Sequence, residues 1–360
     1  MSTVHVVLPA GVDDPARPSG GNVYDRRVCH GLRARGWAVC EHVAPGTWPR
    51  PTGAAVAALA RRLRGLPAGA VVLVDGLVAS AASAALRPEA DRLRLVILVH
   101  LPLAEAATVD RIAEVAAEEA AALSAATAVV VTSAWSRDRL VTHYDLSPEI
   151  VQVAYPGVDP APPAPGTPAG GELVCVAAVT RSKGHDDMLA ALATVADRPW
   201  RCTLVGALDR DPGFVADLRT SAVAYGITGR VRFSGPRVGA RLSQAYASAD
   251  ALVLASRVET YGMVVTEALA RGLPVIGTAA GGVPEALRGP GRGPEPGLLV
   301  PVGDRAALAS ALRRWLDEHD LRTHLRRAAA RRRDTLSDWS VTTDQMAAVL
   351  TGAALSEAAA

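Results

Sequence analysis

Short runs of apolar residues alternate with longer stretches of helix-forming residues along the whole chain. Valine-rich runs in the first half predict β-strands at residues 4–8, 71–74, 95–99 and 128–131. Continuous apolar runs of this length are typical of strands that are buried on both faces of a parallel sheet. Residues 23–35, which Gly36 closes, and residues 104–124 are predicted to be helices. The alternation predicts a doubly wound α/β domain.

The pattern is interrupted once and then restarts. Residues 160–171 contain five prolines and three glycines, which exclude a helix or strand interior there. Beyond them, apolar runs predict strands at 173–179, 201–205, 231–234, 251–254, 274–277 and 297–300. We therefore predict an N-terminal domain over 1–160, a linker over 161–171, a second α/β domain over 172–337 and a helical segment over 338–360. The alternative to a linker is a surface loop inside one domain.

Size and composition exclude several classes of protein. A length of 360 residues is that of about two domains, and the 49% of hydrophobic residues suffice for two cores. Lysine and arginine (38) nearly balance aspartate and glutamate (36), which argues against a general nucleic-acid-binding protein. The four cysteines form no CxxC pair, so they predict no metal site. The sequence shows no signal-peptide pattern and no apolar run of about 18 residues, so we expect a cytoplasmic protein without stable membrane insertion.

Two glutamates bracket the segment that follows the predicted strand at 251–254. Glu259 and Glu267 lie on either side of Gly262, and a helix-forming run follows at residues 265–271. A strand, a glycine-containing turn and a helix start direct backbone N–H groups toward an anion beyond the strand end. Carboxylates beside a bound phosphate suit hydroxyl groups, such as those of a sugar. The alternative is a pair of solvated acids at a helix start, where acids are favoured in any case.

Three other segments place glycines or polar side chains directly after a predicted strand. Gly20 and Gly21 precede a helix and permit close approach of a ligand, although the GxGxxG of dinucleotide-binding proteins is absent and a plain turn is the alternative. His100 follows the strand at its carboxyl end, where either a ligand or a structural hydrogen bond would explain it. Arg181 and Lys183 supply two cations at a helix start, a pattern that favours a diphosphate over solvated loop charges.

The second half resembles the nucleotide-sugar domain of retaining GT-B glycosyltransferases, specifically family 4 (glycosyl transferases group 1). The segments that carry the resemblance, in the family's order, are 180–184, 231–237, 245–250, 259–267 and 272–276 with 281–285. The resemblance covers nearly all of residues 171–350 and is thinner in the first half, where it rests on Gly20, Gly21, His100 and residues 155–159. It implies two Rossmann-like, doubly wound parallel-sheet domains that face a central cleft. The helix after residue 338 would cross back to the first domain, with Trp339 at the crossing.

The resemblance implies a role for each matching residue on the donor side. Glu267 would bind the ribose hydroxyls of the nucleotide, and Glu259 would hold hydroxyls of the transferred sugar. The backbone that lines the sugar and the phosphate would be that of Tyr261, Gly262, Met263 and Val264. Position 263 is more often phenylalanine in the family, a difference of little weight because the contact is mainly through the backbone.

The cations have implied roles of their own. Arg181 and Lys183 would neutralise the diphosphate leaving group. Only Ser182 separates them, whereas family members often carry more residues between the two cations, so whether Arg181 reaches the same phosphate is open. Arg237 would contact the base, largely through its backbone.

Gly20 and Gly21 would approach the diphosphate and the acceptor, and His100 would contact the sugar near its reacting carbon. The implied activity is that of a hexosyltransferase, which moves a sugar from a nucleotide diphosphate sugar (UDP by default) to a hydroxyl of a small soluble acceptor with retention of configuration. No cofactor and no metal are expected, because no DxD pair lies near these motifs and the cations replace the metal. A GT-B nucleotide-sugar epimerase or hydrolase and a sugar phosphorylase are alternatives, and the oligomeric state is open.

Overall fold

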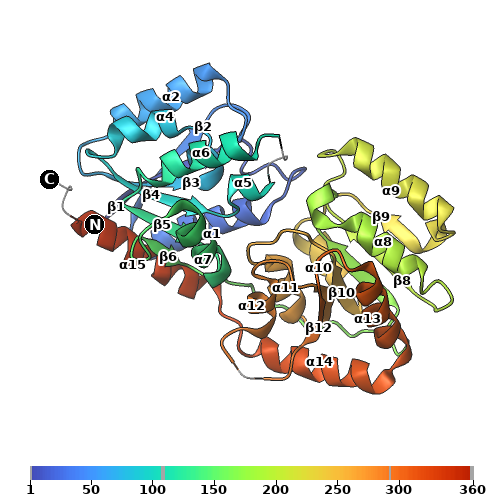
Figure 1. Cartoon of the computed structure of the whole chain (residues 1–360). Coiled ribbons are helices and arrows are strands. Elements are labelled where there is room, and N and C mark those ends of the chain that lie inside the picture. Colours follow the sequence, from blue (N-terminus) through green and yellow to red (C-terminus); the bar gives the residue numbers. More distant parts are fainter. Residues whose placement is uncertain (1, 107–109, 292, 357–360) are drawn as a thin grey trace. The chain divides into compact units, whose positions relative to one another are not determined.

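The chain forms two compact units, each built on its own sheet. The computed structural model describes residues 2–106, 110–291 and 293–356. Met1–Asp13, Gly20–Gly157 and Asp338–Ala360 make up the first unit, and Asp14–Ser19 with Val158–Ser337 make up the second. Each unit contains a six-stranded parallel sheet with helices packed on its faces (Figure 1). The α/β class predicted for both halves is confirmed.

The first sheet has the strand order β2-β1-β3-β4-β5-β6. Its strands are β1 (Thr3–Pro9), β2 (Ala38–Ala44), β3 (Val71–Asp75), β4 (Arg94–Val99), β5 (Ala128–Val131) and β6 (Val151–Val153). The helices of this unit are α1 (Gly20–Ala34), α2 (Gly53–Arg64), α3 (Gly76–Ala79), α4 (Ser83–Leu86), α5 (Leu103–Ala106), α6 (Ile112–Leu123), α7 (Ala134–Tyr144) and α15 (Trp339–Leu355). Strands are added first on one side of β1 and then on the other, so the topological switch point lies between β1 and β3.

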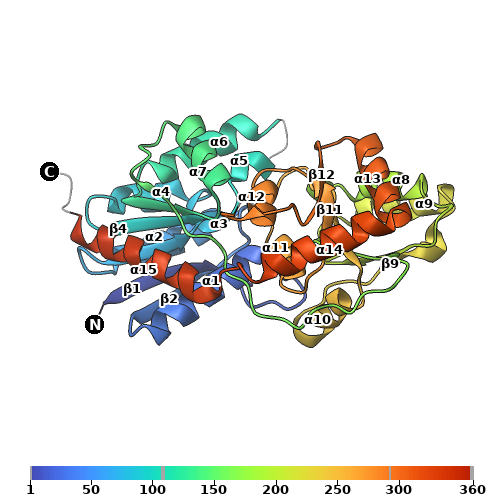
Figure 2. The same cartoon turned by 90° about the horizontal axis from the view of Figure 1, so that it is seen from below.

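The strands of the first unit divide their side chains between two cores. On β4, Leu95, Ile97 and Val99 pack with residues of α2, α4, α6 and α7. Val96 and Leu98 pack with residues of α1 and α15 on the opposite face. Successive side chains of a strand point to opposite faces, so a sheet covered on both faces requires a run without polar residues. Figure 2 shows α6 and α7 on one side of these strands and α15 on the other.

The single helix predicted over residues 104–124 is wrong. The structure has two helices there, α5 and α6, and residues 107–109 between them lie outside the described part of the chain. The carboxylate of Glu119 in α6 accepts a hydrogen bond from the backbone N–H of Leu103 at 2.8 Å. Glu119 therefore satisfies a free N–H group at the start of α5, and α5 packs against α6 instead of continuing it.

The hydrophobic pattern predicts neither β2 nor β6. In β2, the polar pair Glu41 and His42 interrupts the apolar run, and most of its side chains are at least partly exposed because it is an edge strand. β6 has only three residues. Both strands lie at the edges of the sheet. Each pairs with one neighbour only, and its side chains need not be buried on both faces.

The second sheet has the strand order β12-β11-β10-β7-β8-β9. Its strands are β7 (Glu172–Val176), β8 (Arg201–Val205), β9 (Val231–Phe233), β10 (Ala251–Leu254), β11 (Val275–Thr278) and β12 (Gly297–Val300). Its helices are α8 (His185–Ala193), α9 (Pro212–Ala224), α10 (Gly239–Ala247), α11 (Met263–Leu269), α12 (Val283–Arg288), α13 (Arg305–Asp317) and α14 (His319–Arg333). The switch point of this sheet lies between β7 and β10.

The proline- and glycine-rich segment is fixed to the second unit through one buried acid. Asp250, which is 0% exposed, accepts hydrogen bonds from the backbone N–H and the hydroxyl of Thr167. The same carboxylate accepts from the backbone N–H of Glu172 at 2.9 Å and from Arg326 of α14 at 2.6 Å.

Within the described residues, no helix has both the length and the apolar character needed to cross a bilayer.

Candidate functional site

Three adjacent loops meet at the carboxyl edge of the second sheet. β7, β10 and β11 are neighbours, and the loops after them lead into a short 3₁₀ turn (Arg181–Lys183), α11 and α12. The switch point between β7 and β10 falls within this group, and doubly wound sheets bind ligands at such points. Most of the donor-side residues predicted from the sequence therefore lie on neighbouring loops.

The first two of these loops approach each other through their backbones. Gly184 has a φ of 63°, and a Cβ at this position would lie 1.9 Å from the carbonyl oxygen of Ala255. The backbone N–H of Arg257 donates to the carbonyl oxygen of Ser182 at 2.8 Å. Only glycine allows both the left-handed backbone and this close approach. The two loops are consequently held in a fixed register.

Lys183 and Glu259, which lie 76 residues apart in the sequence, form an ion pair at this edge. Lys183 Nζ donates to Glu259 Oε2, and the two side chains are 26% and 15% exposed. The carbonyl oxygen of Glu259 also accepts from the backbone N–H of Gly282 at 2.9 Å, which joins the third loop to the pair. The structure thus brings together the cation and the carboxylate that the sequence predicts beside the phosphate and the sugar.

Lys183 is the only lysine of the chain. Of the 38 lysine and arginine residues, the other 37 are arginines. Arginine presents a planar fork of donors, whereas lysine presents a compact charge with three rotatable donors. A chain that uses arginine at every other cationic position therefore keeps a compact ammonium group here. This signal is present in the sequence and was missed by reasoning from motifs alone.

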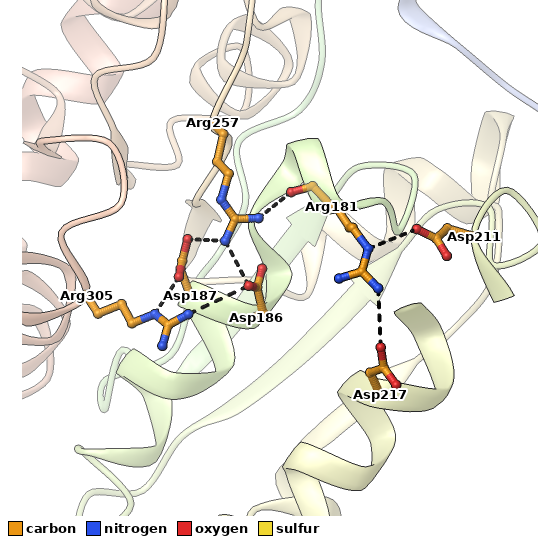
Figure 3. Close-up of polar contacts among 7 residues, drawn as sticks. All are labelled: Arg181, Asp186, Asp187, Asp211, Asp217, Arg257 and Arg305. Atoms are coloured by element: carbon orange, nitrogen blue, oxygen red, sulfur yellow. Dashed lines mark hydrogen bonds and ion pairs between the residues drawn. The ribbon is translucent and has the colours of Figure 1, made fainter. Parts of the chain in front are cut away.

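Arg257 anchors the loop after β10 to the start of α8, as Figure 3 shows. Its guanidinium donates to the carboxylates of Asp186 at 2.8 Å and Asp187 at 2.6 Å, and to the carbonyl oxygen of Arg181. Arg305 of α13 contacts the same two carboxylates. Burial opposes ionisation of Asp186, but the hydrogen bond and charge of Arg257 lower the pKa of its carboxyl on balance. The sequence alone predicts no functional role for the four side chains of this network, which are Arg257, Asp186, Asp187 and Arg305.

The side chain of Arg181 contacts α9 and the residue before it (Figure 3). Its guanidinium lies 3.7 Å from the carboxylate of Asp211 and 3.4 Å from that of Asp217. It also lies over the ring of Phe214, 4.9 Å from the ring centroid, and is 66% exposed. The two cations predicted to share the diphosphate therefore have different partners in this structure.

Glu267 has a buried partner that the sequence did not indicate. Tyr246 of α10 donates its hydroxyl to Glu267 Oε2 at 2.7 Å. The guanidinium of Arg271 lies over the Tyr246 ring, 4.7 Å from its centroid. Burial raises the pKa of Glu267, although Tyr246 and Arg271 oppose the rise. Glu267 thus accepts a hydrogen bond from a hydroxyl group in the structure. A hydrogen bond of the same kind, from the ribose hydroxyls, is predicted for it.

The backbone between the two glutamates forms the start of α11. Gly262 has a φ of 87°, and the helix begins at Met263. The side chain of Tyr261 is buried, whereas Met263 and Val264 are partly exposed. These are the four residues predicted to line the sugar and the phosphate, and only Thr260 separates them from Glu259 in the chain.

Arg237 lies in the loop between β9 and α10 and lines a hollow of about 570 Å³. Three further arginines line this hollow: Arg201, Arg230 and Arg232. Neither Lys183 nor the two predicted glutamates line it. The structure therefore groups Arg237 with other arginines along β8 and β9 and not with the Lys183–Glu259 pair.

The first unit carries a second polar cluster, built around His100. Gly20 and Gly21 begin α1 beside the switch point of the first sheet, and His100 directly follows β4. A Cβ on Gly21 would lie 3.0 Å from Cδ2 of the His100 ring, so the start of α1 packs against the imidazole. The structure thus brings together the residues predicted in the first half of the chain.

Asp25 and Asp75 complete this cluster, and neither is predicted from the sequence. His100 Nε2 lies 2.8 Å from Asp25 Oδ1 and 3.6 Å from Asp75 Oδ2. The side chains of the two aspartates are 2% and 5% exposed, and that of His100 is 18% exposed. Asp75 is the last residue of β3, so the strand-end criterion that selected His100 would also have selected this acid.

The spacing of the cluster fits a hydrogen bond between His100 and Asp25 better than a metal ion shared by both. Among the described residues, Asp25, Asp75 and His100 form a group whose ligand atoms lie within 4.8 Å of one another. Two ligands about 2.1 Å from a tetrahedral ion lie about 3.4 Å apart. The 2.8 Å between Nε2 of His100 and Oδ1 of Asp25 is shorter and fits a direct hydrogen bond.

Burial and charge act in opposite directions on His100. Burial alone would lower the pKa of the imidazole, but the charge and hydrogen bond of Asp25 and the charge of Asp75 raise it on balance. Burial, with the nearby charge of Asp25, raises the pKa of Asp75 to about 8. Both groups therefore hold protons more strongly than they would in water.

Comparison with known sequences identifies relatives of this chain. The sequence profile of the family described as Glycosyl transferases group 1 matches residues 170–318. The D-inositol 3-phosphate glycosyltransferase 1 of Catenulispora acidiphila is 32% identical over 254 residues, which are 65% of this chain and 59% of that protein. The match spans less than two thirds of the relative's own length.

Solved structures share the fold over nearly the whole chain. Sucrose-phosphate synthase from Thermosynechococcus elongatus has a TM-score of 0.78 at 21% identity, with coverage of 98% of this chain and 99% of that one. HepE of Anabaena, in a complex with UDP-glucose, has a TM-score of 0.74 at 18% identity, with coverage of 98% and 100%. At these identities the likeness concerns the fold, and the GT-B fold predicted from the sequence is confirmed.

Proposed function

The chain belongs to the glycosyl transferases group 1 family, and from this premise we propose that it transfers a sugar from a nucleoside diphosphate sugar to an acceptor hydroxyl with retention of configuration. The observation that carries the proposal is the Lys183–Glu259 pair, which three loops fix at the switch point of the second sheet. A cation beside a carboxylate suits a substrate in which a diphosphate adjoins a sugar.

The chemistry proposed requires charge stabilisation more than a protein nucleophile. When the bond between the anomeric carbon and the diphosphate oxygen breaks, negative charge develops on that oxygen. The Lys183 ammonium stabilises it, since a fixed cation in a partly buried site needs no reorganisation during the reaction. Before this step, Glu259 has exchanged its contact with Lys183 for hydroxyls of the sugar. The acceptor oxygen bonds to the anomeric carbon on the face from which the diphosphate departs, and the acceptor's proton passes to the departing phosphate oxygen.

The nucleotide is proposed to bind through the remaining residues of the second unit. Glu267 would accept the ribose hydroxyls, as it accepts the hydroxyl of Tyr246 in the structure. The backbone N–H groups of residues 261–264 would face the diphosphate. Arg237 would contact the base. From the first unit, Gly20, Gly21 and His100 would meet the diphosphate and the sugar.

The names of similar proteins suggest which substrates to test first. HepE binds UDP-glucose, so we propose a UDP-sugar as the donor. The Catenulispora relative is named for D-inositol 3-phosphate, so we propose a phosphorylated cyclitol as the first acceptor among small hydroxyl compounds. Release of UDP that depends on such an acceptor would support transfer. Release of free sugar at the same rate without any acceptor would contradict it in favour of a hydrolase.

We also propose that transfer needs no divalent metal, because Lys183 and the backbone N–H groups already supply positive charge to the leaving group. The rate should be the same with added Mg²⁺ or Mn²⁺ and with EDTA. Loss of activity in EDTA, restored by the metal, would overturn this part of the proposal.

The single lysine makes the central contact directly observable. Reductive methylation with ¹³C-formaldehyde labels the Lys183 side-chain amine and keeps its charge, and the Lys183→Arg variant identifies its NMR signal. We expect UDP to shift this signal. Titrations with UDP, GDP and ADP, followed by the same signal, rank the three nucleotides by their affinity. If no nucleotide diphosphate moves the signal at concentrations that support transfer, Lys183 does not contact the diphosphate.

A further inference from the structure

We propose that Asp25 and Asp75 form a proton-sharing pair that fixes His100 of the first unit as an imidazolium, with Asp25 as its positioning residue. The consequence for catalysis rests on the proposed function, because it requires His100 to meet the donor sugar. The arrangement of protons stands on the structure of the cluster alone.

The hydrogen-bond geometry leaves one place for a shared proton. Asp25 uses Oδ1 toward His100, and its Oδ2 is buried with no hydrogen-bond partner in the structure. Asp75 uses Oδ1 to accept the backbone N–H of Leu77 at 2.7 Å, and a carboxylate oxygen of Asp75 lies within 4.8 Å of one of Asp25. A buried carboxylate oxygen without a donor is costly. A proton on Asp75 supplies a donor for the Asp25 carboxylate.

The charge balance of the cluster requires the same proton. Two carboxylates this close in a buried site do not both ionise readily, and one takes up a proton. With the proton on Asp75, the remaining charges are the Asp25 carboxylate and the His100 imidazolium, which neutralise each other. The raised pKa values of Asp75 and His100 agree with this assignment.

The other titratable groups that pack around the cluster from α1 remain neutral. Tyr24 meets the His100 ring edge-on, with 5.2 Å between centroids, and donates its hydroxyl to the carbonyl oxygen of Ala154 at 2.9 Å. Burial raises the pKa of the Tyr24 phenol and raises that of the Cys29 thiol to about 12. The protonation of the cluster therefore changes with pH through Asp75 and His100.

This arrangement predicts an alkaline limit to activity. As the pH rises through about 8, Asp75 loses its proton and the cluster gains a negative charge. The added charge repels a diphosphate sugar that meets His100. The rate of transfer should fall at least threefold between pH 7 and pH 9 for this reason.

The same substitution at the two acids separates their roles. Asp75→Asn keeps an acceptor for Leu77 and a permanent donor for Asp25, so it imitates the protonated acid. We expect it to remove the fall in rate between pH 7 and pH 9. Asp25→Asn removes the counter-charge of the imidazolium without changing its shape. We expect it to lower kcat at least tenfold at pH 7 while the KM for the donor changes less than threefold.

An NMR titration of the imidazole tests the proton arrangement without any activity. The His100 ring signals are assigned by their loss in His100→Gln. In the wild type their midpoint should lie above 6.5, and in Asp25→Asn it should fall by at least one pH unit, more than in Asp75→Asn. A wild-type midpoint at or below 6.5, equal shifts in the two variants, or displacement of the proton by equimolar Zn²⁺ would overturn the proposal. If the midpoints behave as expected but no donor sugar is transferred, the proposed function fails and the proton sharing stands.

Discussion

Each unit buries a histidine near the carboxyl edge of its sheet, and the two histidines have opposite tendencies to hold a proton. His185 begins α8 directly after the Lys183 loop, and its Nε2 lies 3.8 Å from Sγ of Cys175. Burial, with a smaller contribution from the charge of Lys183, lowers the pKa of His185 to about 4. His100 is also largely buried, but the carboxylates buried with it raise its pKa. Burial alone therefore does not decide the charge of a histidine, and the partners that are buried with it do.

The same contrast distinguishes the two candidate sites. In the second unit, the charges near Lys183 are neutralised by ion pairs between partly exposed side chains. In the first unit, the charges of the His100 cluster are almost closed off from solvent and depend on bound protons. An anionic ligand should therefore act mainly on the second site, and pH mainly on the first.

Loss of the central cation should have the largest effect. Lys183→Ala should lower kcat/KM for transfer by well over tenfold, about 1.4 kcal/mol or more, because charge on the leaving group is no longer stabilised. Arg314→Ala is a matched control, since Arg314 of α13 is 51% exposed, belongs to the same unit and does not line the hollow around Arg237. Equal rates for Lys183→Ala and the control would show that the ion pair has no part in the reaction.

The buried His185 should make the second unit sensitive to acid. Its folded pKa of about 4 lies below the value of 6.5 that it has when unfolded, so the unfolded chain binds the extra proton first. Stability should fall by on the order of 3 kcal/mol as the pH falls from about 6.5 to 4. Urea unfolding of the wild type and of His185→Gln across this range measures the effect, and an equal fall in both would contradict it. The His100 cluster has the opposite sign, because it loses stability as the pH rises through about 8.

Removal of Arg257 should loosen the loops that hold the ion pair. Arg257→Ala removes donors to Asp186, to Asp187 and to the carbonyl oxygen of Arg181. We expect the free energy of unfolding to fall by about 1–3 kcal/mol, because Asp187 is only 9% exposed and keeps a single arginine partner. Urea denaturation measures the change. A loss no larger than that of an exposed arginine variant would show that the network does not stabilise the loops.

The exposed pairs of Arg181 should matter least. Asp217→Ala removes one acid from a guanidinium that is 66% exposed, and the acid itself is 69% exposed. The free energy of unfolding should change by less than about 1 kcal/mol. A larger loss in thermal or urea unfolding would mean that the contact of Arg181 with α9 is structural.

Strands buried on both faces could be predicted from the sequence almost to the residue. The runs at 128–131, 201–205, 251–254 and 297–300 are strands with the same bounds in the structure. In the strands at 128–131 and 251–254 every residue is buried and apolar, which leaves a clear pattern, whereas β8 begins with the exposed Arg201 and β12 is an edge strand of apolar residues. β2 and β6 could not be found in this way because β2 contains Glu41 and His42 and β6 has only three residues. The break between α5 and α6 depends on a capping contact from Glu119, which local helix propensity does not reveal.

The candidate site divides along similar lines. Lys183 and Glu259 were predicted from strand-end position and family resemblance, and the structure joins them. Asp25 could not be selected in the same way, because it lies inside a helix and becomes significant only where α1 meets His100. Arg257 was visible in the sequence, but its role depends on two acids 70 and 71 residues away. The residue types could be read from the sequence, but the contacts between distant segments could not.

The backbone lock between the Lys183 loop and the loop after β10 has a consequence for protein engineering. The two loops are held together by the hydrogen bond from Arg257 to Ser182 and by the close approach of Gly184 to Ala255. Neither loop can therefore change its length without disturbing the other. A library that varies the length of one loop alone would mostly sample broken registers. Donor specificity should therefore be exchanged between homologous proteins by grafting both loops together as one cassette.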